Sequence, residues 1–490
     1  MNFNLSNPLF LKRKNKNRVN PSSLNQALAP SSRKNRFYKQ SLLLALFFFS
    51  TSGQAKIIIN IGSAKVKKSV IALSPFLLKN NSFTEEDKKL GESMFSHLNE
   101  NLKRSSYFKI LPSAAFIENP IEKAPIPWPE NIRGFRWENW KLSGTDFLLF
   151  NSYTISEGQV RVKVAFYNIN LKKAVFQRKY STSSQHIESL INRLSNDLVQ
   201  KLSGRKGIFE TKITSVKTLS NGQKELFVMN WNGIDSRRIT FHRSIVLSPV
   251  WSPDGQKLAY TAFVFNKKLK KRQAILFLYD RKTRLIKILS RHQGANLGAD
   301  FLSNGTGLFV TLEKGRGLMD IFKLNMFNTN ISPLTNGPPG VINVEPSVNP
   351  RNNRIAFSSN RNGKAHIYTM DSTGGSVRQL TSVGHYNATP DWSPFKNKLV
   401  FSGKDGRHFD IFMMNGDGSG LRRLTHLKKS NGQRANCESP SFSPDGRFIV
   451  FTSDVTGTYQ LFIMNLDDLY IERITFDNHH YKSPKWSPYL

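Results

Sequence analysis

The spacing of hydrophobic and polar residues changes near residue 206. Beyond that point the chain consists of short alternating runs separated by turn residues, as in "SPVWSPDGQKLAYTA" at 248–262. Within this stretch Pro253, Asp254 and Gly255 suit a tight turn, because proline presets φ and glycine supplies positive φ. We therefore expect two antiparallel strands joined by this turn.

The same stretch recurs along the chain at separations of 50, 47, 44, 50 and 44 residues. A second motif, first seen as "LFVMN" at 226–230, keeps phase with it and precedes a short strand that ends in Thr or Ser. Four strands in a period of this length are typical of propeller blades, so the repeat predicts an all-β six-bladed β-propeller. The central residues of the six repeats are Trp251, Phe301, Val348, Trp392, Phe442 and Trp486.

The last repeat is incomplete. It stops at "WSPYL", whereas "GIFETKITSVKT" and "KELFVMN", within 207–230, lie before the first repeat. We expect these early strands to complete the last blade, because a closed ring removes the exposed sheet edges of an open array.

Residues 56–206 show another pattern. "KIIINI", "VIALSPF" and "YFKILP" are strand-like, and two or three alternating strands follow at 147–181. Helical spacing begins behind a capping pair, Thr84 with Asp87, and recurs at 187–202. These elements predict an α/β N-terminal domain in which helices pack on a small mixed sheet.

Residues 1–55 differ from both regions, with nine Lys or Arg and no acidic residue. A basic cluster at 33–39 precedes the apolar run "SLLLALFFF" and the small residues "STSGQA". This order is typical of a secretory signal peptide, cleaved here after Ala55, with an uncleaved interfacial anchor as the alternative. The predicted domains are therefore 1–55, 56–206 and 207–490, with "LSGRKGIF" at the last junction.

The composition is strongly basic, with 71 Lys and Arg, 34 Asp and Glu, and a formal charge of +37. Such a balance ordinarily suggests nucleic acid, but export separates the protein from it, so we expect no nucleic-acid partner. The run "KKLKKR" at 267–272 is a candidate contact for an anionic envelope surface, or a solvated hairpin tip. A single cysteine, Cys437, excludes an internal disulfide, and we interpret it as a small buried or loop residue.

Several motifs occur in an order that points to one family. "KIIINI" opens the predicted mature chain, "WKLSGTDFLL" follows in the α/β domain, and the six repeats lie between "LSGRKGIF" and "WSPYL". Over residues 55–490 the sequence resembles the TolB family, the periplasmic component of the Tol-Pal system of Gram-negative bacteria. The resemblance implies a non-enzymatic scaffold in the periplasm, and we expect a monomer that needs no cofactor.

The resemblance also implies two partners. The outer-membrane lipoprotein Pal would bind at one mouth of the propeller canal, and TolA or a TolA-like inner-membrane protein would bind the mature N-terminal segment. This coupling would support outer-membrane invagination in cell division and envelope integrity. The implied contact residues are Lys56, Ile57, Ile58, Ile59, Asn60, Ile61 and Gly62 in the segment, and Arg291, His292, Gln293, Val344, Glu345, Asn387, Thr389 and Glu438 at the mouth.

The loops that lead into the inner strands are rich in histidine, since 50 residues hold six of the ten. In a propeller these loops share one face, so we expect the histidines to surround the canal mouth. They suggest a pH-sensitive partner surface or a metal site, or they reflect chance enrichment of a polar residue in loops. The six are His242, His292, His385, His426, His479 and His480.

Enzymatic alternatives find little support in the motifs. The sequence contains no Gly-x-Ser-x-Gly elbow, phosphate loop, Cys-x-x-Cys or His-Glu-x-x-His. The second hypothesis is an exported propeller that binds glycans or hydrolyses them with canal carboxylates. A pair such as Glu345 and Glu438 would then lie about 5–10 Å apart.

Overall fold

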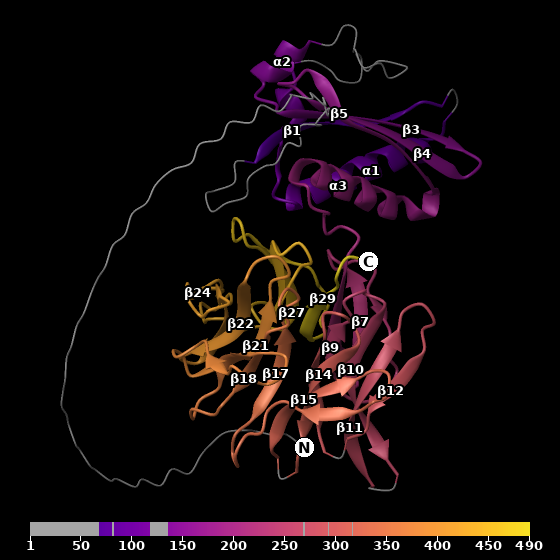
Figure 1. The fold of residues 1–490 in the computed structure, drawn as a ribbon. Coiled ribbons are helices and arrows are strands. Elements are labelled where there is room, and N and C mark those ends of the chain that lie inside the picture. Colours follow the sequence, from indigo (N-terminus) through magenta and orange to yellow (C-terminus); the bar gives the residue numbers. More distant parts are fainter. Residues whose placement is uncertain (1–67, 81–82, 118–135, 268–269, 293, 316) are drawn as a thin grey trace, which may run out of the picture. The chain divides into compact units, whose positions relative to one another are not determined.

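The computed structural model describes residues 68–80, 83–117, 136–267, 270–292, 294–315 and 317–490. These residues belong to one compact unit and form an α/β domain followed by a β-propeller (Figure 1). The predicted signal peptide, the segment Lys56–Gly62 and Gln293 lie outside the described residues. Within the described residues, no helix is both long and apolar enough to cross a membrane.

The N-terminal domain is built on a five-stranded sheet in the order β2-β1-β3-β4-β5. β1 runs parallel to β2 and β3, whereas β3, β4 and β5 pair antiparallel, which confirms the predicted mixed sheet. The strands are β1 (Ser69–Leu78), β2 (Phe108–Ile110), β3 (Phe147–Ser156), β4 (Gln159–Asn168) and β5 (Lys173–Ser183).

Two long helices cover one face of this sheet and a short helix covers the other (Figure 1). The predicted capping pair is present, since Thr84 accepts the backbone N–H of Asp87 and the Asp87 carboxylate accepts that of Thr84. The short helix was not predicted, and its Trp140 fills the core of its own face. The helices are α1 (Glu85–Arg104), α2 (Trp137–Leu142) and α3 (Ile187–Ser203), with single turns η1 (Ser113–Ala115) and η2 (Ser184–His186).

The rest of the chain forms six four-stranded antiparallel sheets, which confirms the six predicted blades. Blade 1 contains β9 (Val246–Trp251), β10 (Lys257–Asn266), β11 (Lys271–Asp280) and β12 (Ile286–Ser290). Blade 2 contains β13 (Asn296–Phe301), β14 (Gly307–Glu313), β15 (Met319–Asn325) and β16 (Ile331–Pro333). Blade 3 contains β17 (Asn343–Val348), β18 (Ile355–Ser359), β19 (His366–Met370) and β20 (Arg378–Gln379).

The remaining blades repeat this order. Blade 4 contains β21 (Tyr386–Trp392), β22 (Lys398–Asp405), β23 (His408–Asn415) and β24 (Arg422–Arg423). Blade 5 contains β25 (Cys437–Phe442), β26 (Phe448–Ser453), β27 (Gln460–Asn465) and β28 (Ile471–Arg473). Blade 6 joins both ends of the domain, as β29 (Tyr481–Trp486), β6 (Lys212–Thr218), β7 (Lys224–Asn230) and β8 (Arg237–Arg238).

Blade 6 closes the ring as the incomplete last repeat predicts. β29 pairs antiparallel with β6, from Tyr481 opposite Lys217 to Trp486 opposite Ile213. β29 also contacts β9, the inner strand of blade 1, so the six inner strands form an unbroken ring. Each inner strand is the terminal strand of its own sheet, and the closed ring places these six edges around the canal.

Arg447 joins the propeller to the N-terminal domain. Its guanidinium donates to the carbonyl of Ser105 at 3.0 Å, pairs with Asp467, and lies 3.7 Å from the ring centroid of Tyr107. Arg447 belongs to the turn between β25 and β26, at the end where the inner strand leaves the canal. The N-terminal domain therefore meets the propeller at the end opposite the loops that lead into the inner strands.

Candidate partner-binding mouth of the propeller canal

Every inner strand carries a β-bulge at the same place. In each blade the pairing between the inner strand and its neighbour shifts register once. The bulge residue has a φ between 46° and 55°, a left-handed conformation that is uncommon outside glycine. The bulge residues are Ser248, Gly298, Glu345, Thr389, Ser439 and Ser483.

The bulge explains why a proline stands two residues before the central residue in five of the six repeats. In five blades the bulge residue precedes a proline, and in blade 2 it is glycine followed by Ala299. A bulge redirects the side chains around it. Together the bulge residues and the residues after them line a small central cavity of about 110 Å³.

Three canal carboxylates join neighbouring blades. Asp300 accepts the backbone N–H of Val348 at 2.7 Å, and Asp391 accepts that of Phe442 at 2.8 Å. Glu345, one of the predicted mouth residues, accepts the N–H of Thr389 at 2.7 Å. Each bond links an inner strand to the inner strand of the next blade, so these acids stabilise the ring.

A lysine from blade 6 offsets part of this charge. Lys485 Nζ lies 2.5 Å from Asp391 Oδ1. Burial raises the pKa of Asp300 to about 6 and also raises the pKa of Glu345. Burial opposes the charge of Lys485, but the carboxylates of Asp391, Asp300 and Glu345 outweigh it and raise the pKa of the lysine. The canal centre is therefore a coupled cluster in which one lysine offsets part of the charge of three carboxyl groups.

Closer to the loops that enter the inner strands lies a second charge pair. Lys482 Nζ is 3.1 Å from Glu438 Oε2, and the Tyr459 hydroxyl donates to Glu438 Oε1 at 3.0 Å. The lysine also lies 3.0 Å from the centroid of the Tyr459 ring. The two charged side chains keep 35% and 26% of their surface exposed, so a partner can reach them.

The other predicted mouth residues differ in exposure: two are partly exposed and one is buried. Val344 on β17 and Thr389 on β21 are partly exposed, and Thr389 Oγ1 lies 2.7 Å from Ser402 Oγ. Asn387 is only 4% exposed, and its amide donates to the carbonyl of Val383. It therefore supports its loop and offers little surface.

The loop between β12 and β13 contributes the remaining two. Arg291 is exposed, whereas His292 is half-buried, with its Nε2 3.0 Å from the carbonyl oxygen of Glu313. The backbone N–H of His292 donates to Ser290 Oγ. Of this pair, Arg291 is the residue that a partner can contact.

The predicted histidines occupy the loops that lead into five of the six inner strands, all except β17. His385, His426 and His480 are exposed. His242 is half-buried against Tyr260 and Phe277, and burial lowers its pKa. Across the part of the chain that the structure describes, no group of three or more His, Cys, Asp or Glu is arranged to hold a metal ion.

Cys437 begins β25 and is fully buried, as predicted for a packing residue. Burial raises the pKa of its thiol to about 12. The thiolate is the reactive form, so this cysteine is chemically inert at neutral pH.

Comparison with known proteins assigns both domains. Residues 57–175 match the sequence model of the TolB amino-terminal domain, and residues 199–434 match that of the TolB beta propeller domain. The chain belongs to the TolB family. The same fold occurs in the crystal structure of TolB from Acinetobacter baumannii, with a TM-score of 0.70 and 21% identity over 86% of this chain and 97% of that one.

Relatives of this TolB-family chain include the Tol-Pal system protein TolB of Desulfosudis oleivorans, 29% identical over 37% of this chain and 40% of the relative. The Tol-Pal system protein TolB of Nitrosomonas europaea is 25% identical over 52% of this chain and 54% of the relative. A TolB homolog of Chlorobium luteolum is 31% identical over 48% of this chain and 51% of the relative. The chain thus spans about half the length of the relatives it matches.

Proposed function

We propose that this chain is a non-enzymatic periplasmic scaffold of the Tol-Pal system. It binds Pal through the propeller mouth and a TolA-like inner-membrane protein through the segment Lys56–Gly62, and so supports outer-membrane invagination and envelope integrity. The observation that carries the proposal is the presence of both TolB domains, in order, in one chain. The signal-like sequence of residues 1–55 supports export to the periplasm.

The geometry of the mouth suits a binding surface. The carboxylates beneath it are used in bonds between blades, so the ring that carries the loops is stiff. Glu438 and Lys482 are held in place by Tyr459 yet remain half-exposed. A preorganised surface loses little conformational entropy when a partner binds.

The same observations disfavour the glycan hydrolase. Burial raises the pKa of Glu345, as in many general acids, but its carboxylate already accepts bonds from Ser358 and Thr389. Glu438 is paired with Lys482. The central cavity of about 110 Å³ is also smaller than the about 300 Å³ at which ligand pockets begin.

A pull-down from detergent-solubilised envelope tests the proposal. The baits are residues 56–490, residues 63–490, and 56–490 carrying Glu438→Arg, with Glu92→Arg on exposed α1 as the matched charge control. We expect the first two baits and the control to recover the peptidoglycan-associated lipoprotein, and Glu438→Arg to lose it. The TolA-like protein should be recovered by every bait except 63–490. Recovery of neither partner by the intact mature chain would contradict the proposal.

A further inference from the structure

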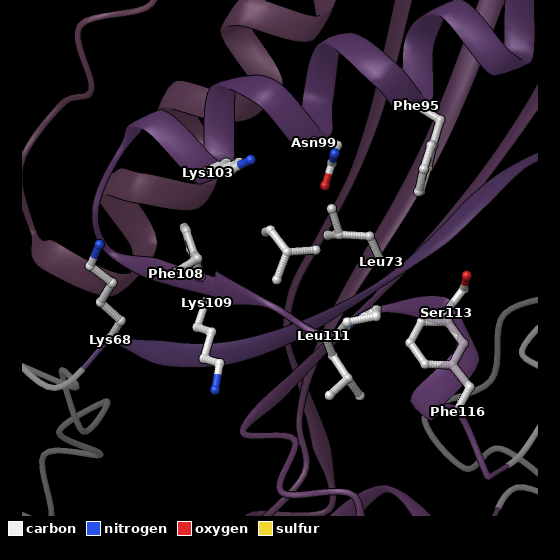
Figure 2. Close-up of a pocket in the computed structure, with 12 residues that line it drawn as sticks. Lys68, Leu73, Phe95, Asn99, Lys103, Phe108, Lys109, Leu111, Ser113 and Phe116 are labelled. Carbon is white, nitrogen blue, oxygen red and sulfur yellow. The ribbon is translucent and has the colours of Figure 1, made fainter. Parts of the chain in front are cut away.

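A groove with a cavity volume of about 530 Å³ runs along one edge of the N-terminal sheet. One wall is α1, which contributes Phe95, Asn99 and Lys103 at a spacing of four residues (Figure 2). The other is β2 with the segment that follows it to Phe116. In Figure 2 Phe95 and Phe116 lie towards one end, whereas the lysines of the groove gather at the other.

The groove exposes an unpaired strand edge. β2 is the terminal strand of the sheet and pairs only with β1 among the described residues. Tyr107 O accepts from Ser69 N, and Leu111 N donates to Ile71 O, so these residues face β1. Strand alternation therefore turns the backbone N–H and C=O groups of Phe108 and Ile110 away from β1. Phe108 is only 2% exposed, so the groups that a partner can reach are those of partly exposed Ile110.

The charge around the groove is positive. Lys68 pairs with Asp468 at 3.0 Å, but Lys103 and Lys109 form no ion pair with the residues that the structure describes. Both lysines are exposed, and the groove surface beside them is apolar, with partly exposed Ile110 and Leu111. As far as the described residues go, the surface therefore combines backbone groups of Ile110 that pair with no second strand, apolar area and two lysines outside any ion pair.

We propose that this groove binds an extended acidic and apolar peptide segment of a partner protein, which adds a strand to the free edge of β2. A strand places successive side chains on opposite faces, so one set of side chains can cover the apolar surface. Acidic side chains at the lysine end then meet Lys103 and Lys109. Strand addition of this kind takes affinity from main-chain bonds and specificity from side chains. None of the residues that line the groove belongs to either contact of the proposed function.

Two segments of the chain itself flank the groove in sequence, and each lacks one part of this chemistry. Residues 56–67 carry Lys56, Lys65 and Lys67 and no acidic residue, so their charge repels the groove. Residues 118–135 carry three glutamates, but they also contain four prolines, which lack the N–H that a paired strand donates. A separate acidic strand fits better than either.

The test uses mature protein, residues 56–490, and a fluorescent peptide of sequence EVEIEVEI. We expect saturable binding measured by fluorescence anisotropy, and slower hydrogen exchange at the amide of Ile110. The double variant Lys103→Glu with Lys109→Glu should weaken binding by about tenfold or more, since it converts two attractions into repulsions. Lys163→Glu, an exposed lysine on β4, should leave binding unchanged.

Three outcomes would overturn the proposal. The first is equal binding of a peptide whose backbone is N-methylated at alternate residues, because such a peptide cannot pair with the strand edge. The second is equal binding of KVKIKVKI. The third is lysine-dependent binding to vesicles of phosphatidylglycerol without binding to the peptide, which would assign the groove to an anionic membrane. Tighter peptide binding by residues 68–490 would show that the chain's own segment competes for the groove, against the charge argument above.

Discussion

The two ends of the propeller use charge in different ways. At the end that meets the N-terminal domain, the Arg447 side chain is only 3% exposed and is hydrogen-bonded to the other domain. At the mouth, Lys482 and Glu438 are paired but half-exposed. The buried charge fixes a joint, because leaving it unpaired is costly, whereas the exposed pair can exchange its partner at low cost. One end is therefore structural and the other is available for binding.

The largest loss of stability is expected from a substitution at Arg447, which joins the two domains. Arg447→Ala leaves the Ser105 carbonyl and the Asp467 carboxylate without their buried partner. We expect the free energy of unfolding to fall by about 3–5 kcal/mol. Guanidinium denaturation followed by tryptophan fluorescence measures the change. Arg237→Ala at an exposed residue should change it by less than about 0.5 kcal/mol, and equal losses in the two variants would remove the contrast between the ends.

A residue of the canal between the two ends should make the free energy of unfolding depend on pH. The pKa of Asp300 is raised by burial from 3.8 to about 6, so between these values the native carboxyl keeps a proton that the unfolded chain has released. The stability contributed by Asp300 is therefore present below this window and is lost as pH rises through it. Relative to Asp300→Asn, wild type should lose about 2 kcal/mol between pH 4 and pH 7. Urea denaturation at several pH values checks this, and a gain in that range would contradict the burial argument.

A smaller effect is expected at the mouth pair. Lys482→Met removes a half-exposed ion pair with Glu438, so the free energy of unfolding should fall by only about 0.5–1 kcal/mol. The same denaturation experiment as for Arg447→Ala measures it. A loss as large as that of the joint variant would show that the mouth pair is structural too.

The smallest effect is expected in the affinity for the partner when the pH is lowered. Histidine side chains generally gain a proton between pH 8 and pH 5, and those of the mouth include exposed His385 and His480. His385 lies beside Lys404, and His480 beside Tyr459. We predict that Pal binds about threefold more weakly at pH 5.5 than at pH 7.5, because each exposed charge interaction contributes about 0.2–1 kcal/mol. Calorimetry with equal affinities at both values would reject the pH-sensitive surface.

The fold could be predicted because its signals are local. Alternation within each run and a period set by turn residues are enough to count blades, and the capping pair Thr84 with Asp87 marks where α1 begins. The short helix α2 was missed because six residues carry too little periodicity. Its place depends on Trp140 packing in the core of the sheet's other face.

The site was harder to predict from the sequence, because its contacts form only when the ring is closed. Lys485 and Asp391 are 94 residues apart, and Lys482 and Glu438 are 44 apart. One local signal was present, since Asp300, Asp391 and Lys485 occupy the repeat position that holds a neutral residue in the other blades. Charge at such a position indicates a canal residue once the ring is closed.

The central claim is that the loops leading into the inner strands form the binding face. Hydrogen exchange of the mature chain, with and without the peptidoglycan-associated lipoprotein lacking its lipid anchor, tests it directly. The account predicts slower exchange in the loops at 382–389 and 426–438, and no change in the turn at 443–447. Protection confined to that turn or to the N-terminal domain, or no protection at saturating partner, would contradict the account.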